Sequence, residues 1–388
     1  MLAFFSVENF LSFAARRSLD LRVSDAESPD STTRLVANNA WKIDRHVLIR
    51  GGPGSGKTNL LRALGFLRRI LLQGRVSVVS SHGLPSCRFA KPLQPTCFAL
   101  GVRLSDRLFQ YEASFTVEQV HHERLGYQID GQDYQLVFER RMKHPILALV
   151  DTELGPSARA DADWFLLAQT EVSPHELFLS AAILAGVPTV RSLSVWLNQG
   201  LQLLFSDLSA PGLASRVARV PNVGELLTEC LQSAGLPAVQ VCVTSLPVPP
   251  DFFQNETEQA NVLSALQRYP DAFVSTGDGE LIAVQNHDGE STLRRVVLQV
   301  FFRGASGETA SFAVAELPET ALRIFHLAPL LFPKAEAQAV CFVVDKWSVG
   351  LPEATQAYIL KKALGHGTQL ILTDDSADGE LAFLPQPG

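Results

Sequence analysis

Residues 46–64, "HVLIRGGPGSGKTNLLRAL", run from a short apolar stretch through a glycine-rich segment into a pattern typical of a helix. Within them Gly51, Gly56, Lys57 and Thr58 fit the pattern G-x-x-x-x-G-K-[ST]. Glycines let the backbone turn its N–H groups toward an anion, and the N-terminus of a following helix points at the same anion. This stretch therefore predicts a buried strand, a phosphate-binding loop and a helix, in that order.

The loop predicts a site for a nucleotide, with ATP and Mg²⁺ as its ligands. In this type of loop the lysine, here Lys57, reaches the β- and γ-phosphates, and the hydroxyl of Thr58 binds Mg²⁺. The residues expected to bind the nucleotide are Gly51, Gly52, Pro53, Gly54, Ser55, Gly56, Lys57, Thr58 and Asn59.

Composition limits the other classes of protein. The chain has 388 residues, of which 46% are hydrophobic and 19% are charged, so it can bury a large core and is not globally disordered. Its longest apolar runs are too short to span a bilayer, and its first residues lack the basic segment of a signal peptide. We therefore expect a cytoplasmic protein with no membrane partner. The five dispersed cysteines predict free thiols.

The formal net charge of −7 gives no general attraction to nucleic acid, so a DNA partner has no support from charge. A local basic surface has one candidate, a group of arginines just after the loop, although a solvated helix face is the more ordinary interpretation. These arginines are Arg62, Arg68, Arg69 and Arg75.

A second cluster, His121, His122 and Glu123, has no further metal ligand at a binding spacing. We interpret it as an exposed turn or strand end.

The order of patterns predicts a nucleotide-binding domain assembled from both ends of the chain. Residues 1–147 contain an early hairpin, the loop and an antiparallel meander, and residues 251–388 end in a strand, a helix and a strand. Residues 148–250 are expected to form a mainly helical insertion, with helices over residues 161–169 and 190–205 among others.

Two motifs resemble the start of bacterial ATPases related to the ABC, SMC, RecF and OLD groups, which open with a pattern like VxNFxSF and continue with a loop like GxNxxGKSNLLxAL. The first is matched by Val7, Asn9, Phe10, Ser12 and Phe13, and the second by Gly51, Gly56, Lys57, Asn59, Leu60, Leu61, Ala63 and Leu64. The resemblance implies an α/β, ABC-type P-loop NTPase fold, with a mixed sheet flanked by helices, an antiparallel β sub-lobe and the helical insertion.

The same resemblance implies a second acidic motif far from the first. The apolar run "AVCFVVD" brings Asp345 to the end of a buried strand, where it is expected to bind Mg²⁺ through water beside Thr58. A compact kinase or small GTPase does not normally separate its two motifs so widely.

Two catalytic parts of the family pattern are altered near this strand. The family's aspartate is followed by a glutamate that polarises the attacking water, whereas Asp345 is followed by Lys346. The family's histidine after the last strand is replaced by Asp374 and Asp375, carboxylates that repel the γ-phosphate.

The third altered part is the signature motif that contacts a partner's nucleotide. Here it keeps Glu316 and Thr320 but loses the family's serine and glycine, with Pro318 nearby. The three changes together predict weak or absent hydrolysis, so we assign no catalytic residue. Another glutamate, namely Glu316, Glu319 or Glu353, is the alternative as a substitute base.

These observations predict a nucleotide-binding regulatory or scaffold subunit of a bacterial defence or DNA-maintenance system. By resemblance it forms a homodimer, or a heterodimer with a related ATPase, with nucleotide between the subunits. A separately encoded nuclease or toxin is its candidate effector partner. Two alternatives stay open, namely a slow ATPase with a non-standard base and a RecF-like ATPase that binds DNA.

Overall fold

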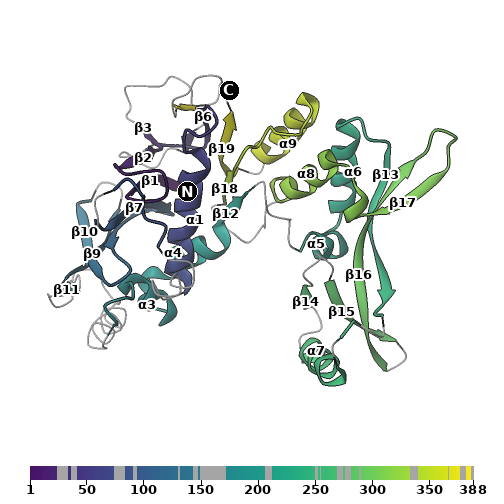
Figure 1. Ribbon diagram of the computed structural model, residues 1–388, viewed down its shortest axis with the longest axis horizontal. Helices are drawn as coiled ribbons and strands as arrows, with labels where there is room; N and C mark the ends of the chain where they lie inside the picture. The colour runs from purple at the N-terminus through teal and green to yellow at the C-terminus, as the bar shows by residue number, and fades with distance from the viewer. Residues whose placement is uncertain are drawn as a thin grey trace. The chain divides into compact units, whose positions relative to one another are not determined.

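The computed structural model describes residues 1–23, 34–35, 42–73, 84–90, 94–129, 132–142, 147–148, 172–205, 212–249, 252–253, 255–268, 274–275, 281–287, 290–332, 340–365, 367–375 and 382–385. The chain divides into two compact units (Figure 1). Unit 1 contains Met1–Leu203, Lys334–Trp347 and Thr368–Gly388, and unit 2 contains Leu204–Pro333 and Ser348–Gly367. Each unit is therefore assembled from segments that are distant in sequence.

Unit 1 contains an antiparallel sheet in the strand order β11-β10-β9-β8-β7-β1-β2. Its strands are β1 (Leu2–Glu8), β2 (Arg17–Asp20), β7 (Thr96–Leu104), β8 (Arg107–Phe115), β9 (Val120–Ile129), β10 (Tyr134–Arg141) and β11 (Leu147–Ala148). The early hairpin is the antiparallel pair β1–β2, and the meander is β7 to β10, so both predictions are confirmed.

Aromatic rings fill the core beside this sheet. The ring of Phe98 on β7 lies between 5.7 and 6.3 Å, centroid to centroid, from the rings of Phe5, Phe10, Phe66 and Phe115. Offset and edge-on contacts of this kind add to the free energy gained by burying the rings. Because Phe66 belongs to the helix that follows the loop, this cluster attaches that helix to the sheet.

A second sheet of unit 1 has the order β12-β18-β19-β6-β20. Its strands are β6 (His46–Gly51), β12 (Leu201–Leu204), β18 (Cys341–Val344), β19 (Gln369–Asp375) and β20 (Ala382–Pro385). β18 pairs with β19 and β19 with β6 in parallel, while β20 is antiparallel to β6. Residues in β18 and most of those in β6 and β19 are buried, which explains why these strands are continuous apolar runs.

The side chain of Gln369 connects this sheet to its surroundings at the start of β19. Its amide oxygen accepts the N–H of Leu2 at 2.7 Å, and its amide nitrogen donates to the carbonyl oxygens of Leu2 at 2.8 Å and Asp44 at 3.0 Å. Asp44 ends β5 (Lys42–Asp44), which lies between β3 (Arg22–Val23) and β4 (Arg34–Leu35) in a small third sheet. One buried amide therefore links three sheets.

The helices of unit 1 begin with α1 (Lys57–Gln73), which follows β6 through the glycine-rich loop and buries its leucine face. The others are α3 (Phe178–Leu184), α4 (Arg191–Val195) and the short helices η2 (Pro188–Val190) and η3 (Trp196–Gly200). The hydroxyl of Ser180 on α3 contacts the carbonyl oxygens of Ile70 at 3.1 Å and Leu71 at 2.8 Å, near the end of α1. Carbonyls in the last turn of a helix have no partner within it, so this contact stabilises the α1–α3 pair.

Unit 2 contains the strand order β13-β16-β15-β14, and β17 pairs with β16. Its strands are β13 (Ala238–Pro247), β14 (Val274–Ser275), β15 (Leu281–His287), β16 (Glu290–Arg303) and β17 (Thr309–Ala313). Its helices are α5 (Leu213–Arg219), α6 (Val223–Ser233), α7 (Glu256–Arg268), η4 (Val314–Glu316), α8 (Glu319–Leu327), η5 (Ala328–Leu330) and α9 (Glu353–Gly365).

Helix α6 lies directly on β13. A Cβ atom at Gly224 would lie 2.4 Å from the carbonyl oxygen of Val241, so only glycine allows this approach. The hydroxyl of Thr228 accepts the N–H of Val241 at 3.0 Å. On the same helix Glu229 accepts a hydrogen bond of 2.6 Å from the hydroxyl of Tyr358 on α9.

The prediction of a helix over residues 190–205 is wrong in its last part. The helical segment ends with η3 at Gly200, and Leu201–Leu204 form strand β12 beside β18. Residues 201–204 can satisfy their backbone hydrogen bonds either in a longer helix or in a sheet. The neighbouring strand β18 is available for pairing, so these residues form a strand. Residues 161–169 lie outside the described residues. The boundaries expected at 147/148 and 250/251 stay predictions.

All five cysteines are free, as the sequence predicts. In the part of the chain that the structure describes, no single helix is long and apolar enough to cross a membrane. One pair, Phe178–Leu184 with Pro188–Gly200, reaches that length and composition only when its two parts are taken together, and they are bent by 98°.

Residues 121–123 lie at the start of β9, so the expectation of a strand end is confirmed, but Glu123 is buried, which corrects the expectation that it is exposed. Its carboxylate accepts the hydroxyl of Tyr111 at 2.9 Å and the N–H groups of Phe178 at 2.7 Å and Leu179 at 2.9 Å. The two amides begin α3, where a negative charge is favourable. Burial raises the pKa of Glu123, although these three hydrogen bonds oppose that shift.

Replacing Glu123 with alanine should lower the free energy of unfolding by about 3 kcal/mol, because three buried donors lose their acceptor. Chemical denaturation followed by circular dichroism measures this loss. The control is Glu118→Gln at an exposed position of the β8–β9 connection, expected to change stability by less than about 0.5 kcal/mol. Equal losses in the two variants would contradict a structural role for the Glu123 carboxylate.

Candidate functional site

The glycine-rich loop contains two residues in the left-handed region. Gly54 has a φ of 82° and Gly56 a φ of 102°, and both conformations are unfavourable for residues with a Cβ atom. Between them the hydroxyl oxygen of Ser55 is buried and has no hydrogen-bond partner. Buried hydroxyl groups normally have one, so an anion held by the loop would supply the missing acceptor. Pro53 and Gly54 are exposed at the tip of the loop.

The turn at residues 9–13 supports the loop from one side. The backbone groups of Phe10 and Phe13 hydrogen-bond to each other in both directions, at 3.0 and 2.8 Å. The ring of Phe13 then lies so close to Gly56 that an added Cβ would be 2.8 Å from its Cε1 atom. The side chain of Asn59 donates to the hydroxyl of Ser12 at 2.9 Å. The two motifs that carried the family resemblance therefore contact each other.

Asn9, the first residue of the same turn, is fixed by hydrogen bonds to residues 87, 94 and 96. It has a φ of 52°, and its side chain accepts the N–H of Cys87 at 3.0 Å and donates to the carbonyl oxygen of Gln94 at 2.6 Å. The hydroxyl of Thr96 donates to its carbonyl oxygen at 2.8 Å. Asparagine tolerates a positive φ better than most residues, which explains this residue type at the turn.

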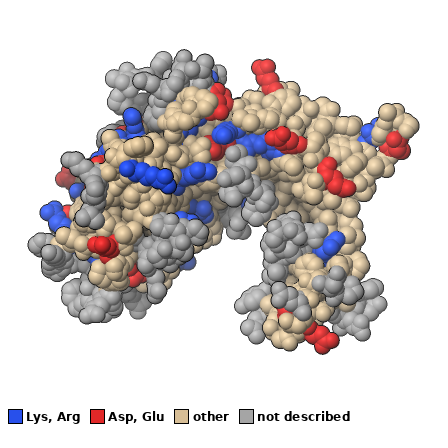
Figure 2. All heavy atoms as spheres, in the orientation of Figure 1, with Lys and Arg blue, Asp and Glu red and all other residues tan. Residues whose placement is uncertain are grey.

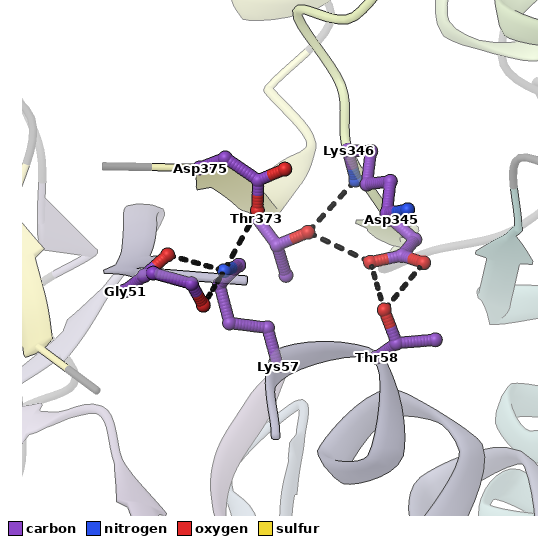
Figure 3. A network of polar contacts seen from close by, with 8 residues as sticks. Gly51, Lys57, Thr58, Asp345, Lys346, Thr373 and Asp375 are labelled. Carbon is purple, nitrogen blue, oxygen red and sulfur yellow. Dashed lines mark hydrogen bonds and ion pairs between the residues drawn. The ribbon is translucent and has the colours of Figure 1, made fainter. Parts of the chain in front are cut away.

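Lys57, the first residue of α1, is nearly fully buried, with a side chain 5% exposed. Its ammonium group donates to the carbonyl oxygens of Gly51 and Gly52 and forms an ion pair of 2.8 Å with Asp375 (Figure 3). The sequence singled out Asp375 only as a carboxylate in place of a histidine. Its pairing with the loop lysine appears only in the tertiary structure.

Thr58 and Asp345, separated by 287 positions, meet at the start of α1 (Figure 3). The Thr58 hydroxyl lies 2.9 and 3.1 Å from the two carboxylate oxygens of Asp345, which is only 2% exposed. The hydroxyl of Thr373 donates to one of these oxygens at 2.9 Å. A buried carboxylate beside a hydroxyl is a donor set that suits Mg²⁺, which prefers oxygen ligands and retains several waters.

Thr373 is a part of the site that the sequence interpretation missed. It lies on β19, and besides contacting Asp345 it accepts the N–H of Lys346 at 2.8 Å. Lys346 has a φ of 48°, so the chain turns sharply after Asp345. The N–H of Trp347 donates to the carbonyl oxygen of Thr373 at 3.0 Å, so Thr373 holds both residues of that turn. The sequence offered one signal for Thr373, because it lies two positions before Asp375 on the same predicted strand and so points to the same face.

The residues of the altered signature motif lie in unit 2. The Glu316 carboxylate accepts the N–H of Ala313 at 2.7 Å and caps η4, while Pro318 precedes the first turn of α8, which contains Thr320. Two other candidates for a substitute base, Glu319 at the start of α8 and Glu353 at the start of α9, lie in the same unit. Glu316 therefore has a local structural role.

The arginines after the loop differ in their burial and contacts. The guanidinium of Arg68 donates to the carbonyl oxygens of Leu197 at 2.6 Å and Asn198 at 3.0 Å, and burial lowers its pKa. Arg62 and Arg69 are exposed on α1, and Arg75 lies outside the described residues. On the face drawn in Figure 2, basic side chains lie among acidic ones.

Among the described residues, no group of three or more His, Cys, Asp and Glu could hold a metal ion.

No protein-family model matches the sequence, and no curated protein sequence matches it. Solved structures similar to this chain include an SMC head bound to the C-winged helix domain of ScpA, with 9% identity, a TM-score of 0.47, and coverage of 99% of this chain and 97% of that chain. The SMC head domain from Thermotoga maritima has 10% identity, a TM-score of 0.36, and coverage of 100% and 99%. The recombination mediator protein RecF has 13% identity, a TM-score of 0.36, and coverage of 99% and 98%.

The fold class rests on the chain's own topology. The glycine-rich loop follows β6 and leads into α1, β19 lies between β6 and the strand that delivers Asp345, and an antiparallel sheet adjoins them in the same unit. The chain has an α/β fold with mixed sheets, of the ABC P-loop type.

Replacing Gly56 with alanine should destabilise the protein more than replacing Gly54. Both substitutions strain a left-handed residue, at a cost of about 1 kcal/mol or more. The Cβ at position 56 also collides with Phe13, whereas nothing lies within 4 Å of a Cβ at position 54, so we expect about 1–3 kcal/mol of additional loss. Chemical denaturation without ligand compares the two variants. Equal losses would show that Phe13 does not support the loop.

Proposed function

We propose that this chain binds Mg²⁺-ATP at the glycine-rich loop and that ATP occupancy controls its assembly with a partner. The proposed nucleotide-binding residues are those of the loop, from Gly51 to Asn59, and the proposed metal ligands are Thr58 directly and Asp345 through water. Mg²⁺ would neutralise phosphate charge at this position. In this proposal the chain is a regulatory or scaffold subunit of a bacterial defence or DNA-maintenance system.

The observation that carries the proposal is the contact between Thr58 and Asp345. The hydroxyl of Thr58 lies within 3.1 Å of both carboxylate oxygens of a residue from the far end of the chain. Asp345 is buried, and burial of a carboxylate is costly. A Mg²⁺ ion bound between this carboxylate and the Thr58 hydroxyl would offset that cost. The buried Ser55 hydroxyl without a partner supports an anion at the same loop.

Weak or absent hydrolysis is supported by the groups next to Asp345. The next residue is Lys346, whose side chain is a cation and cannot act as a general base while protonated. Its backbone is fixed by the hydrogen bond to Thr373. Loss of a positioned base typically costs a factor of about 10²–10⁴ in rate. The slow ATPase with a substitute base remains the alternative.

Control of assembly follows from binding that differs between two states. A nucleotide shifts an equilibrium between free and assembled forms only by the difference in its affinity for them. Such a device needs no rapid hydrolysis. In this proposal the partner is a second copy or a related ATPase, and the effector is a separately encoded nuclease or toxin.

Lys57→Ala should abolish or strongly weaken ATP binding, by roughly 30-fold or more, because it removes the buried cation that faces the phosphates. Isothermal titration calorimetry with Mg²⁺-ATP measures the change. The control is Lys361→Ala at an exposed position of α9, which should leave the affinity unchanged. Absence of ATP binding by the wild-type chain, or equal affinity in the Lys57 variant, would disprove the proposal.

Phosphate release by the wild-type chain should stay well below about 1 s⁻¹ at saturating Mg²⁺-ATP. Lys346→Glu alone should recover little turnover, because Asp375 and the altered signature motif remain. The matched charge reversal, Lys361→Glu, controls for net charge. A wild-type rate near or above that value would contradict weak hydrolysis and favour the ATPase with a substitute base. Full rescue by Lys346→Glu would mean that Asp375 and the altered signature motif do not limit the rate.

A further inference from the structure

We propose that Asp375 is a built-in competitor of the nucleotide phosphates, which sets the affinity of the loop for ATP by occupying Lys57. This inference rests on the proposed function, because it concerns how the same loop binds its ligand. It adds a step that the sequence motif does not contain, namely that a carboxylate of this chain must leave before a phosphate can take its place.

The hydrogen-bonding capacity of Lys57 is filled from within the chain. An ammonium group has three N–H donors and no acceptor. The three acceptors of Lys57 are the carbonyl oxygen of Gly51, that of Gly52 at 3.1 Å, and a carboxylate oxygen of Asp375 at 2.8 Å. A phosphate oxygen that binds Lys57 must therefore displace one of them.

Asp375 is the partner that can leave at least cost. The two carbonyls belong to buried residues of the loop's backbone, and Gly51 is fixed in β6 by its pairing with β19. The Asp375 side chain is 42% exposed, so water can solvate its carboxylate once it separates from Lys57. Asp375 also carries the same sign of charge as a phosphate, and two anions repel each other at one cation.

The sheet fixes Asp375 in this position. β19 and β6 are parallel neighbours, and Asp375, the last residue of β19, is paired with Gly51, the first glycine of the loop. Thr373 lies two residues earlier on β19, so its side chain points to the same face. One strand therefore presents Thr373, which contacts Asp345, and Asp375, which contacts Lys57 (Figure 3).

The consequence is a coupling between nucleotide binding and the end of β19. When only a fraction of molecules has Lys57 free of Asp375, the apparent affinity for ATP falls by that fraction. The Asp375 carboxylate thus lowers the apparent affinity for ATP by pairing with Lys57. Binding of ATP, in turn, releases Asp375 from the loop.

The test is calorimetric titration of Mg²⁺-ATP into the full chain and into Asp375→Asn. Asparagine keeps the shape of aspartate but loses its charge, so the ion pair becomes a weaker neutral hydrogen bond. We expect Asp375→Asn to bind ATP roughly tenfold more tightly than the wild-type chain, the difference expected for a hydrogen bond to a charged group. An affinity equal to or below that of the wild type overturns the inference.

Two matched variants separate pairing from general charge effects. Asp106→Asn, at an exposed position between β7 and β8, makes the same change of net charge and should leave the affinity unchanged. Asp374→Asn removes the neighbouring carboxylate and should have a smaller effect than Asp375→Asn. If Asp374→Asn and Asp375→Asn tighten binding equally, local charge and not occupation of Lys57 is the cause, and the inference fails.

The failure of the inference is distinguishable from that of the proposed function. If the wild-type chain binds ATP and Asp375→Asn binds it no more tightly, nucleotide binding stands and only the competition is disproved. If neither chain binds ATP, the proposed function fails and the inference fails with it. Binding detected only in Asp375→Asn would support the competition but disprove ATP binding as the function of the wild-type chain.

Discussion

The parallel pairing of β6 with β19 is the constraint on which the rest of the site depends. β6 leads into the glycine-rich loop, and β19 is the strand that separates it from β18, which delivers Asp345. Parallel neighbours cannot be joined by a tight turn, so the chain must leave and return. Such a crossover needs only about a dozen residues, so the separation of 287 positions between Thr58 and Asp345 reflects the further elements inserted between the strands. The sheet nevertheless brings the two side chains to within 2.9 Å.

The loop is held by neighbours as well as by its own glycines. The turn that contains Asn9 and Phe13 packs its ring against Gly56, and the side chain of Asn59 reaches back to Ser12. The left-handed residues of the loop are glycines, which adopt this conformation without steric cost. Asn9 in the turn, with a φ of 52°, is held in the same region by its surrounding hydrogen bonds. The short N-terminal motif and the loop motif are thus two sides of one packing arrangement, which gives a physical reason for their joint occurrence.

Lys57, the cation expected to bind phosphate, is already paired with a carboxylate of the same chain. A buried cation requires an anionic or polar partner, because isolated burial is costly. In this chain Asp375 is that anion, so the lysine is satisfied before any ligand arrives. Asp345, by contrast, is contacted by the hydroxyls of Thr58 and Thr373, and a buried carboxylate beside a hydroxyl is a donor set that suits Mg²⁺. The two carboxylates therefore have opposite relations to a nucleotide complex, since one competes with its phosphates and the other suits its metal.

The sequence by itself determined the elements whose signals are local. The glycine spacing predicted the loop before α1, alternating residues predicted the hairpin and meander, and the apolar run predicted the strand that ends before Asp345. Only the tertiary structure decided that Glu123 on β9 is buried against the first amides of α3 and that residues 201–204 join a sheet. It also decided that Thr373 contacts Asp345 and that Asp375 pairs with Lys57. The reason is physical, because periodicity records which face of an element is buried, whereas the partner across a sheet depends on how distant segments pair.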